Sequence, residues 1–140
     1  MSRPKRILLV SRDLMVLQTR KLMLGAYFDV HAAGRVLEAK ALLGEQHFDL
    51  VVLCYTLTQD DCQTIVDTAQ QHCPQARILV LTAAGYAAKP GDIDRYFLAA
   101  EDGPFTLVKK SAELLGFEFR SKGRMVQVAP PGLVPASSGA

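Results

Sequence analysis

Tryptophan is absent from this chain, and cysteine, net charge and long apolar runs are all scarce. The three cysteines are an odd number without an export signal, so a framework of disulfide bonds is not expected. A net charge of +2 creates no large field that would gather nucleic acid or an anionic membrane. No apolar run approaches the roughly 18 residues that span a bilayer. The sequence therefore predicts a cytoplasmic protein with no nucleic-acid or membrane partner.

What the chain does contain is apolar material arranged in short runs. Its 140 residues, 49% of them hydrophobic, suit a single domain with a substantial core. The runs at 7–10, 50–53 and 78–81 are continuously apolar, and weaker runs lie at 27–32 and 96–98. Strands with no polar alternation are typical of a parallel sheet that is covered on both faces.

Helical patterns alternate with these runs. Four helices are predicted. The first covers 14–24 with Asp13 as its N-cap, and the second carries the apolar stripe Val36, Ala39 and Leu43 and stops at Gly44. The third carries the stripe Cys62, Ile65, Val66, Ala69 and Cys73 with Asp60 or Asp61 as its cap, and the fourth carries the stripe Phe105, Val108, Ala112 and Leu115 and ends at Gly116. The alternation of strands and helices predicts an α/β protein with a doubly wound parallel sheet.

Four of these segments resemble landmarks of one family. "RILLVSRD", "GAYFDVHAAG", "FDLVVLCYTL" and "ARILVLTA" are similar to the first four strands of response-regulator receiver domains of two-component signalling. The resemblance covers about residues 5–116. It implies a flavodoxin-like sheet of five parallel strands in the order 2-1-3-4-5. The short spacing between Thr82 and Tyr96 predicts a shortened or missing fourth helix.

The remaining residues, 117–140, form a C-terminal extension in this interpretation. Two strand-like pieces on either side of Ser121-Lys122-Gly123-Arg124 predict a small hairpin over 117–128. Residues 129–140 carry three prolines and no charge, which predicts a flexible tail.

The resemblance also implies where the family's phosphotransfer residues would stand. Receivers use a pair of acids to hold Mg²⁺, an aspartate that accepts the phosphoryl group, and a hydroxyl and a lysine that hold the product. Here the acid pair corresponds to Ser11 and Arg12, the acceptor to Cys54, the hydroxyl to Thr82, and the lysine to Ala99 or Ala100. Because Arg12 would repel a cation, we expect no metal and no cofactor.

Asp13 is the acid next to Ser11 and Arg12, and its position directly before the helix over 14–24 predicts a helix cap rather than a metal ligand. Arg12 is expected to reach toward Asp13, Asp60 or Asp61.

Cys54 has two interpretations. It is either a packing residue that fills the place of an aspartate, or a reactive thiol whose pKa is lowered by Arg12. Packing is favoured, since nearby acids oppose a thiolate and no histidine is adjacent in sequence. Cys62 and Cys73 are expected to pack in the core.

The sequence thus predicts a stand-alone pseudo-receiver without enzymatic activity. It would act in or beside a two-component phosphorelay as a phosphorylation-independent interaction module. The partner would be an unidentified signalling protein or kinase. Formation of a homodimer is a further possibility that the sequence leaves open. The alternatives are a redox sensor that works through Cys54 and a receiver phosphorylated at an atypical acceptor.

Overall fold

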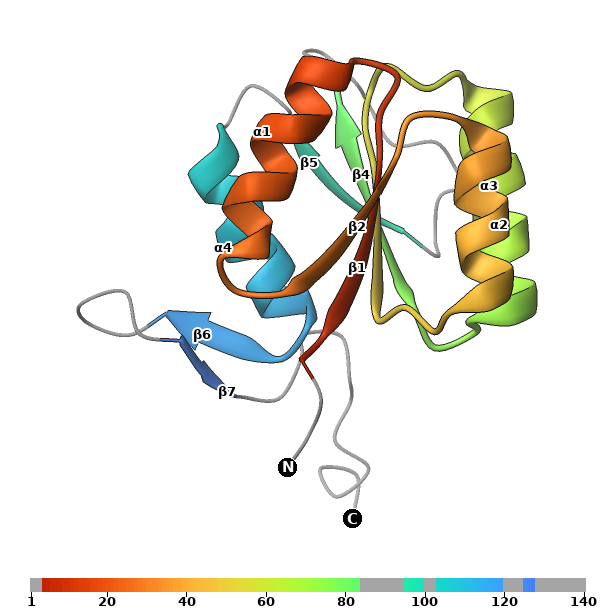
Figure 1. The fold of residues 1–140 in the computed structure, drawn as a ribbon. Coiled ribbons are helices and arrows are strands. Elements are labelled where there is room, and N and C mark those ends of the chain that lie inside the picture. Colours follow the sequence, from red (N-terminus) through yellow and green to blue (C-terminus); the bar gives the residue numbers. More distant parts are fainter. Residues whose placement is uncertain (1–3, 84–94, 100–102, 120–124, 128–140) are drawn as a thin grey trace.

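The computed structural model describes residues 4–83, 95–99, 103–119 and 125–127. The strands and helices alternate along the chain, and a central sheet is covered by helices on both faces (Figure 1). The elements, in order, are β1 (Arg6–Val10), α1 (Leu14–Gly25), β2 (Asp29–Ala33), α2 (Val36–Glu45), β3 (Leu50–Leu53), α3 (Gln59–His72), β4 (Arg77–Thr82), β5 (Tyr96–Ala99), α4 (Pro104–Leu114), β6 (Phe117–Phe119) and β7 (Met125–Gln127).

The main sheet has five parallel strands in the order β2-β1-β3-β4-β5, as the resemblance to receiver domains implies. Helices α1 and α4 cover one face, and α2 and α3 cover the other (Figure 1). Successive residues of the central strands therefore enter different cores. In β1, Ile7 and Leu9 join the core under α1 and α4, whereas Leu8 and Val10 join the core under α2 and α3.

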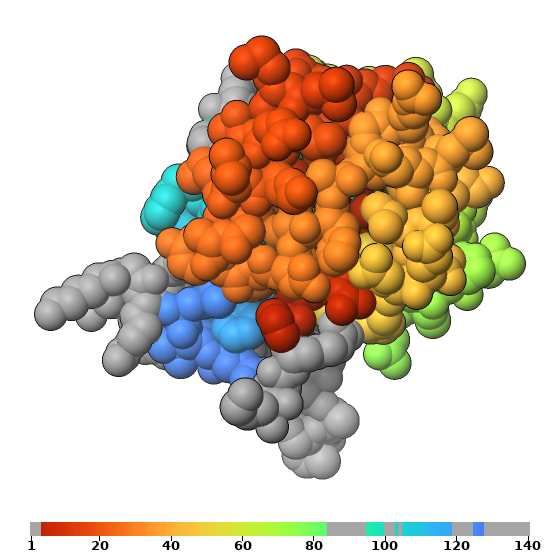
Figure 2. All heavy atoms as spheres, viewed as in Figure 1, coloured from red at the N-terminus to blue at the C-terminus, as the bar shows by residue number. Residues whose placement is uncertain are grey.

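The edge strand β2 lies between α1 and α2, and these three elements form one face of the molecule (Figure 2). Large apolar side chains remain exposed on the two helices. Met15 and Leu22 of α1 are 81% and 76% exposed, and Leu37 of α2 is 78% exposed.

Helix α3 begins differently from the prediction. Thr58, rather than Asp60 or Asp61, is the N-cap, and its hydroxyl accepts a hydrogen bond from the backbone N–H of Asp61 at 3.0 Å. The Asp61 carboxylate accepts in return from the backbone N–H of Thr58 at 3.4 Å, which completes a capping box. Cys73 lies just beyond the helix as its C-cap, and it is buried with Cys62 in the core under α2 and α3.

Two further helix boundaries can be compared with their predictions. Gly44 lies inside α2 and does not stop it, because the helix continues through Glu45. Helix α4 ends before Gly116, which has a φ of +90° that favours glycine, as expected.

The prediction that Phe105 belongs to the buried apolar face of α4 was wrong. Phe105 is 60% exposed, whereas Leu107 and Val108 enter the core. The polar residue on this buried face is Ser111, which is 0% exposed, and its hydroxyl has no hydrogen-bond partner among the described residues.

We predict that Ser111→Ala leaves the free energy of unfolding unchanged or raises it by up to about 1 kcal/mol, because the desolvation cost of an unpaired hydroxyl disappears. Ser11→Ala is a matched control. Ser11 is also 0% exposed, but its hydroxyl is hydrogen-bonded, so its loss should cost about 1–3 kcal/mol. Urea unfolding would measure both. A loss of stability in Ser111→Ala would mean that this hydroxyl has a partner.

The C-terminal hairpin predicted over 117–128 is supported by its strands. β6 and β7 pair antiparallel, with Glu118 opposite Val126. The centroid of the Phe117 ring lies 6.1 Å from that of the Phe28 ring, so β6 contacts the turn between α1 and β2. The predicted fourth-helix region and the predicted tail at 129–140 lie outside the described residues.

Candidate functional site

The carboxyl edge of the parallel sheet collects the positions that the sequence singled out. Ser11 directly follows β1, Cys54 directly follows β3, and Thr82 ends β4. Ala99 ends β5 and is paired in register with Thr82. Ala100 lies outside the described residues. This edge is where open α/β sheets bind their ligands.

Ser11 anchors a small network of hydroxyl groups. Its Oγ accepts a hydrogen bond from the backbone N–H of Asp13 at 3.1 Å and lies 3.2 Å from the Thr56 hydroxyl. The Thr56 hydroxyl also accepts from the backbone N–H of Arg12 at 3.0 Å. Neutral hydroxyls and backbone amides thus tie the β1–α1 turn to the loop after β3.

Asp13 caps α1. Its Oδ1 accepts hydrogen bonds from the backbone N–H groups of Met15 and Val16 at 3.1 and 3.2 Å. The carboxylate is thereby used to satisfy two otherwise unpaired donors of the first turn.

Arg12 turns toward Asp61, one of the three acids named as its candidates. The guanidinium donates to Asp61 Oδ2 through Nε at 3.1 Å and through Nη2 at 2.5 Å. This hydrogen bond is the main reason that the pKa of the Asp61 carboxyl is lowered, and Thr58 contributes to the same shift. The pair links the β1–α1 turn to the start of α3.

Cys54 is 1% exposed and belongs to the core under α1 and α4. Arg20 of α1 donates a hydrogen bond from Nη1 to its Sγ at 3.0 Å. Burial raises the pKa of the Cys54 thiol, and this effect outweighs the charge of Arg20 and the hydroxyl of Ser11, both of which favour the thiolate. The ground state at neutral pH is therefore a buried thiol.

The guanidinium beside Cys54 was misassigned from the sequence, because Arg20 makes the contact and Arg12 is bound to Asp61. A signal for Arg20 was present. Leu17 and Leu24 of α1 are buried, and Arg20 lies three residues after one and four before the other. An arginine on the buried face of a helix is placed to reach the end of the sheet.

A cavity of about 290 Å³ opens beside these residues. It lies between the start of α3 and the strands β4 and β5, and both Cys54 and Thr82 contribute to its wall. The Thr82 hydroxyl donates to the carbonyl oxygen of Leu98 at 3.4 Å, which fixes its position between the two strands.

No cluster of three or more His, Cys, Asp or Glu that could hold a metal ion occurs among the described residues. Within the same ranges, no helix has the length and hydropathy needed to cross a membrane.

Comparison with known proteins identifies the fold. No family model and no curated protein sequence matches the chain. Among solved structures, it is similar to a CheY-like response regulator receiver domain protein from Methanospirillum hungatei (22% identity, TM-score 0.69, covering 81% of this chain and 94% of that one). It is also similar to a response regulator receiver protein from Sinorhizobium medicae (22% identity, TM-score 0.68, 81% and 95% covered).

A third similar structure is the signal receiver domain of an HD domain-containing protein from Pseudomonas fluorescens (26% identity, TM-score 0.62, 76% and 90% covered). The fold of this chain is thus the flavodoxin-like fold of response-regulator receiver domains.

Proposed function

We propose that this protein is a receiver-like interaction module that works in or beside two-component signalling without phosphotransfer and without enzymatic activity. The observation that carries the proposal is the chemistry at the carboxyl edge of the sheet. Where the receiver resemblance implies acids, the site presents the Ser11 hydroxyl, the Arg12 guanidinium and the Cys54 thiol.

The charges at this edge argue against magnesium binding. Arg12 occupies one of the acid positions and is held there by Asp61, so a divalent cation would meet a fixed positive charge. Arg20 adds a second guanidinium beside the acceptor position. The nearby Asp13 is used by the helix cap. Without a metal to neutralise phosphoryl oxygens, transfer to this site lacks its main electrostatic support.

A role in binding is supported by Met15 and Leu22, which are both exposed and lie seven residues apart on one side of α1, since neighbouring exposed apolar side chains favour contact with other proteins. The proposed partner is a signalling protein or a kinase, and a homodimer belongs to the same proposal. The three free cysteines fit a reducing compartment, which supports a cytoplasmic location.

We predict that acetyl phosphate with Mg²⁺ adds no phosphoryl group to the protein, and that a beryllofluoride mimic causes no change in its amide spectrum. The reason is that Ser11, Arg12 and Cys54 offer neither a carboxylate acceptor nor a metal site. Intact mass spectrometry measures the first result and two-dimensional NMR the second.

The matched comparison is the variant Ser11→Asp/Arg12→Asp/Cys54→Asp, which restores the carboxylates that the resemblance implies. If this variant is phosphorylated and the natural protein is not, the site residues are the reason that the natural protein does not accept a phosphoryl group. Addition of one phosphoryl mass to the natural protein, abolished by Cys54→Ala, would instead establish the atypical-acceptor alternative and overturn the proposal.

The redox-sensor alternative draws support from one contact, the hydrogen bond from Arg20 to Cys54 Sγ, because a guanidinium favours a thiolate. The burial of the same thiol opposes it and raises its pKa. The reactivity of Cys54 therefore decides between the two functions.

A further inference from the structure

Helix α1 carries apolar side chains on two opposite sides. Leu17 and Leu24, seven residues apart, are buried against the sheet. Met15 and Leu22, also seven residues apart, are 81% and 76% exposed, so they share the side that faces away from the sheet. This side belongs to the surface of the molecule (Figure 2), and its residues, the outer stripe of α1, are Met15, Gln18, Thr19 and Leu22. Apolar residues on both sides are typical of a helix that is covered on both.

The outer stripe carries no charge. Helix α1 has no acidic residue, and neither of its two cations belongs to the stripe. Arg20 is turned inward to Cys54, and Lys21 lies on the edge of the helix beside the stripe. An uncharged partner surface matches such a stripe, because a charge buried against it would lose its water without gaining a partner.

The outer stripe is also complementary to itself. Two copies of α1 can pack antiparallel about a twofold axis that passes between Gln18 and Thr19. Met15 of each copy then lies opposite Leu22 of the other. The Thr19 hydroxyl donates to the carbonyl oxygen of Met15 in its own helix at 3.0 Å, so its oxygen can accept from the Gln18 amide of the second copy. Antiparallel packing also opposes the helix dipoles and offsets the two Lys21 side chains by roughly 8 Å along the helix.

We propose that the outer stripe of α1 is the contact surface of a homodimer, in which it is covered by the same stripe of a second copy. The inference rests on the proposed interaction role and gives it a surface and a partner. A buried Met or Leu side chain removes about 60–120 Å² of apolar surface from water, so Met15 and Leu22 of both copies contribute a few hundred Å². This is well below the roughly 1,200 Å² of stable complexes, and the dimer is therefore weak and reversible.

Sedimentation equilibrium of the full chain, from about 10 µM to 1 mM, measures the association. We expect a monomer–dimer equilibrium with a Kd of roughly 50–500 µM, in keeping with a small apolar contact. Raising the salt concentration from about 0.1 to 0.5 M should change this Kd by no more than about twofold, because the stripe is uncharged.

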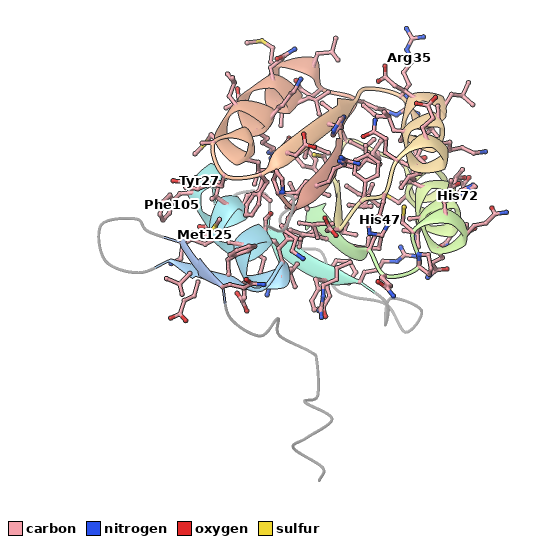
Figure 3. All side chains as sticks on the ribbon, turned by 60° about the horizontal axis from the view of Figure 1, so that its bottom comes forward. Tyr27, Arg35, His47, His72, Phe105 and Met125 are labelled. Atoms are coloured by element: carbon pink, nitrogen blue, oxygen red, sulfur yellow. The ribbon has the colours of Figure 1, made fainter. Side chains whose placement is uncertain are left out.

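Substitutions at two equally exposed leucines locate the contact. Leu22→Glu should weaken dimerisation at least about tenfold, because a carboxylate is then buried opposite Met15 of the second copy. Leu37→Glu is the matched control. Leu37 is 78% exposed and lies two residues after Arg35, which projects from the start of α2, across the sheet from α1 (Figures 1 and 3). This variant should dimerise as the natural protein does, and thermal melts would verify that both variants are folded.

Thiol cross-linking determines the orientation of the two helices. Gln18→Cys places the two new thiols beside the axis, whereas Gly25→Cys separates them by roughly 20 Å along antiparallel helices. A short bismaleimide should therefore join two copies of the first variant and not of the second. A Cβ at Gly25 would meet no atom within 4 Å, so this position has room for the new side chain. The natural protein, whose three cysteines are buried, gives the background.

A natural protein that stays monomeric at the highest concentration would overturn the proposal and leave the stripe to a different partner. Equal weakening by Leu22→Glu and Leu37→Glu, or equal cross-linking of the two cysteine variants, would overturn it as well. If Leu22→Glu does not fold, Met15→Glu replaces it with the same expectation. The proposed function fails by another result, phosphorylation by acetyl phosphate, so a monomer that remains unphosphorylated would refute the dimer alone.

Discussion

Cys54 should react with iodoacetamide at pH 7 at least about a hundredfold more slowly in the folded protein than in urea, because reaction needs both a thiolate and access to it. The side chain is 1% exposed, and burial raises the pKa of its thiol. A raised pKa means that the folded state keeps its proton to a higher pH than the unfolded chain. The thiol therefore adds stability at neutral pH, and this contribution is lost as the pH rises above the ordinary thiol range of about 8.5.

The internal controls for this experiment are Cys62 and Cys73, which are also buried. Mass spectrometry of peptides after timed alkylation would give a separate rate for each cysteine. Similar slow rates for all of them fit a packing role for Cys54. A contrary result would be faster labelling of Cys54 than of the other two cysteines, together with formation of a sulfenic acid in dilute peroxide. If Arg20→Ala abolished both effects, the protein would be a redox sensor and the interaction-module proposal would be wrong.

Arg12→Asp should lower the free energy of unfolding by about 1–2 kcal/mol at pH 7, since a partly exposed ion pair is lost and two carboxylates are brought together. For a chain of this size the melting temperature would fall by roughly 3–6 °C. The Asp61 carboxyl has a lowered pKa in the folded protein, so the pair stabilises the fold above pH 4 and loses its effect as the pH falls. The difference between the variant and the natural protein should therefore shrink toward pH 3.

Arg12→Gln separates the two contributions, because it removes the pair without adding a second acid. We expect it to cost about half as much as Arg12→Asp. Thermal melts with and without Mg²⁺ complete the test. If Arg12→Asp kept its melting temperature and gained stability from Mg²⁺, Arg12 would be the sole block on a latent metal site, and the account of the charges given above would fail.

The sequence predicted local features well where a single residue near a helix end could make the capping hydrogen bonds. Asp13 caps α1 because a carboxylate after a strand finds free backbone N–H groups within its own turn. The cap of α3 was missed because Thr58, Asp60 and Asp61 all qualify locally, and the reciprocal bonds between Thr58 and Asp61 decide which residue is the cap.

The covering of the sheet on both faces was also determined by the sequence, whereas the order of the strands was implied by the resemblance to receiver domains. Runs such as 50–53 are apolar at every position, and only a strand covered on both faces buries them all. The same pattern places Ser11, Cys54 and Thr82 at one edge, because parallel strands end together.

Contacts between segments distant in sequence were decided by the tertiary structure alone. Arg20 reaches Cys54 across 34 positions, and Arg12 reaches Asp61 across 49. The sequence offers each arginine several acids or polar groups as possible partners. Which partner it contacts depends on how α1 and α3 pack against the ends of β1 and β3. The cavity lined by Cys54 and Thr82 depends on the same packing, because its wall joins three separate stretches of the chain, 54–62, 80–83 and 95–97, that only the folded sheet brings together.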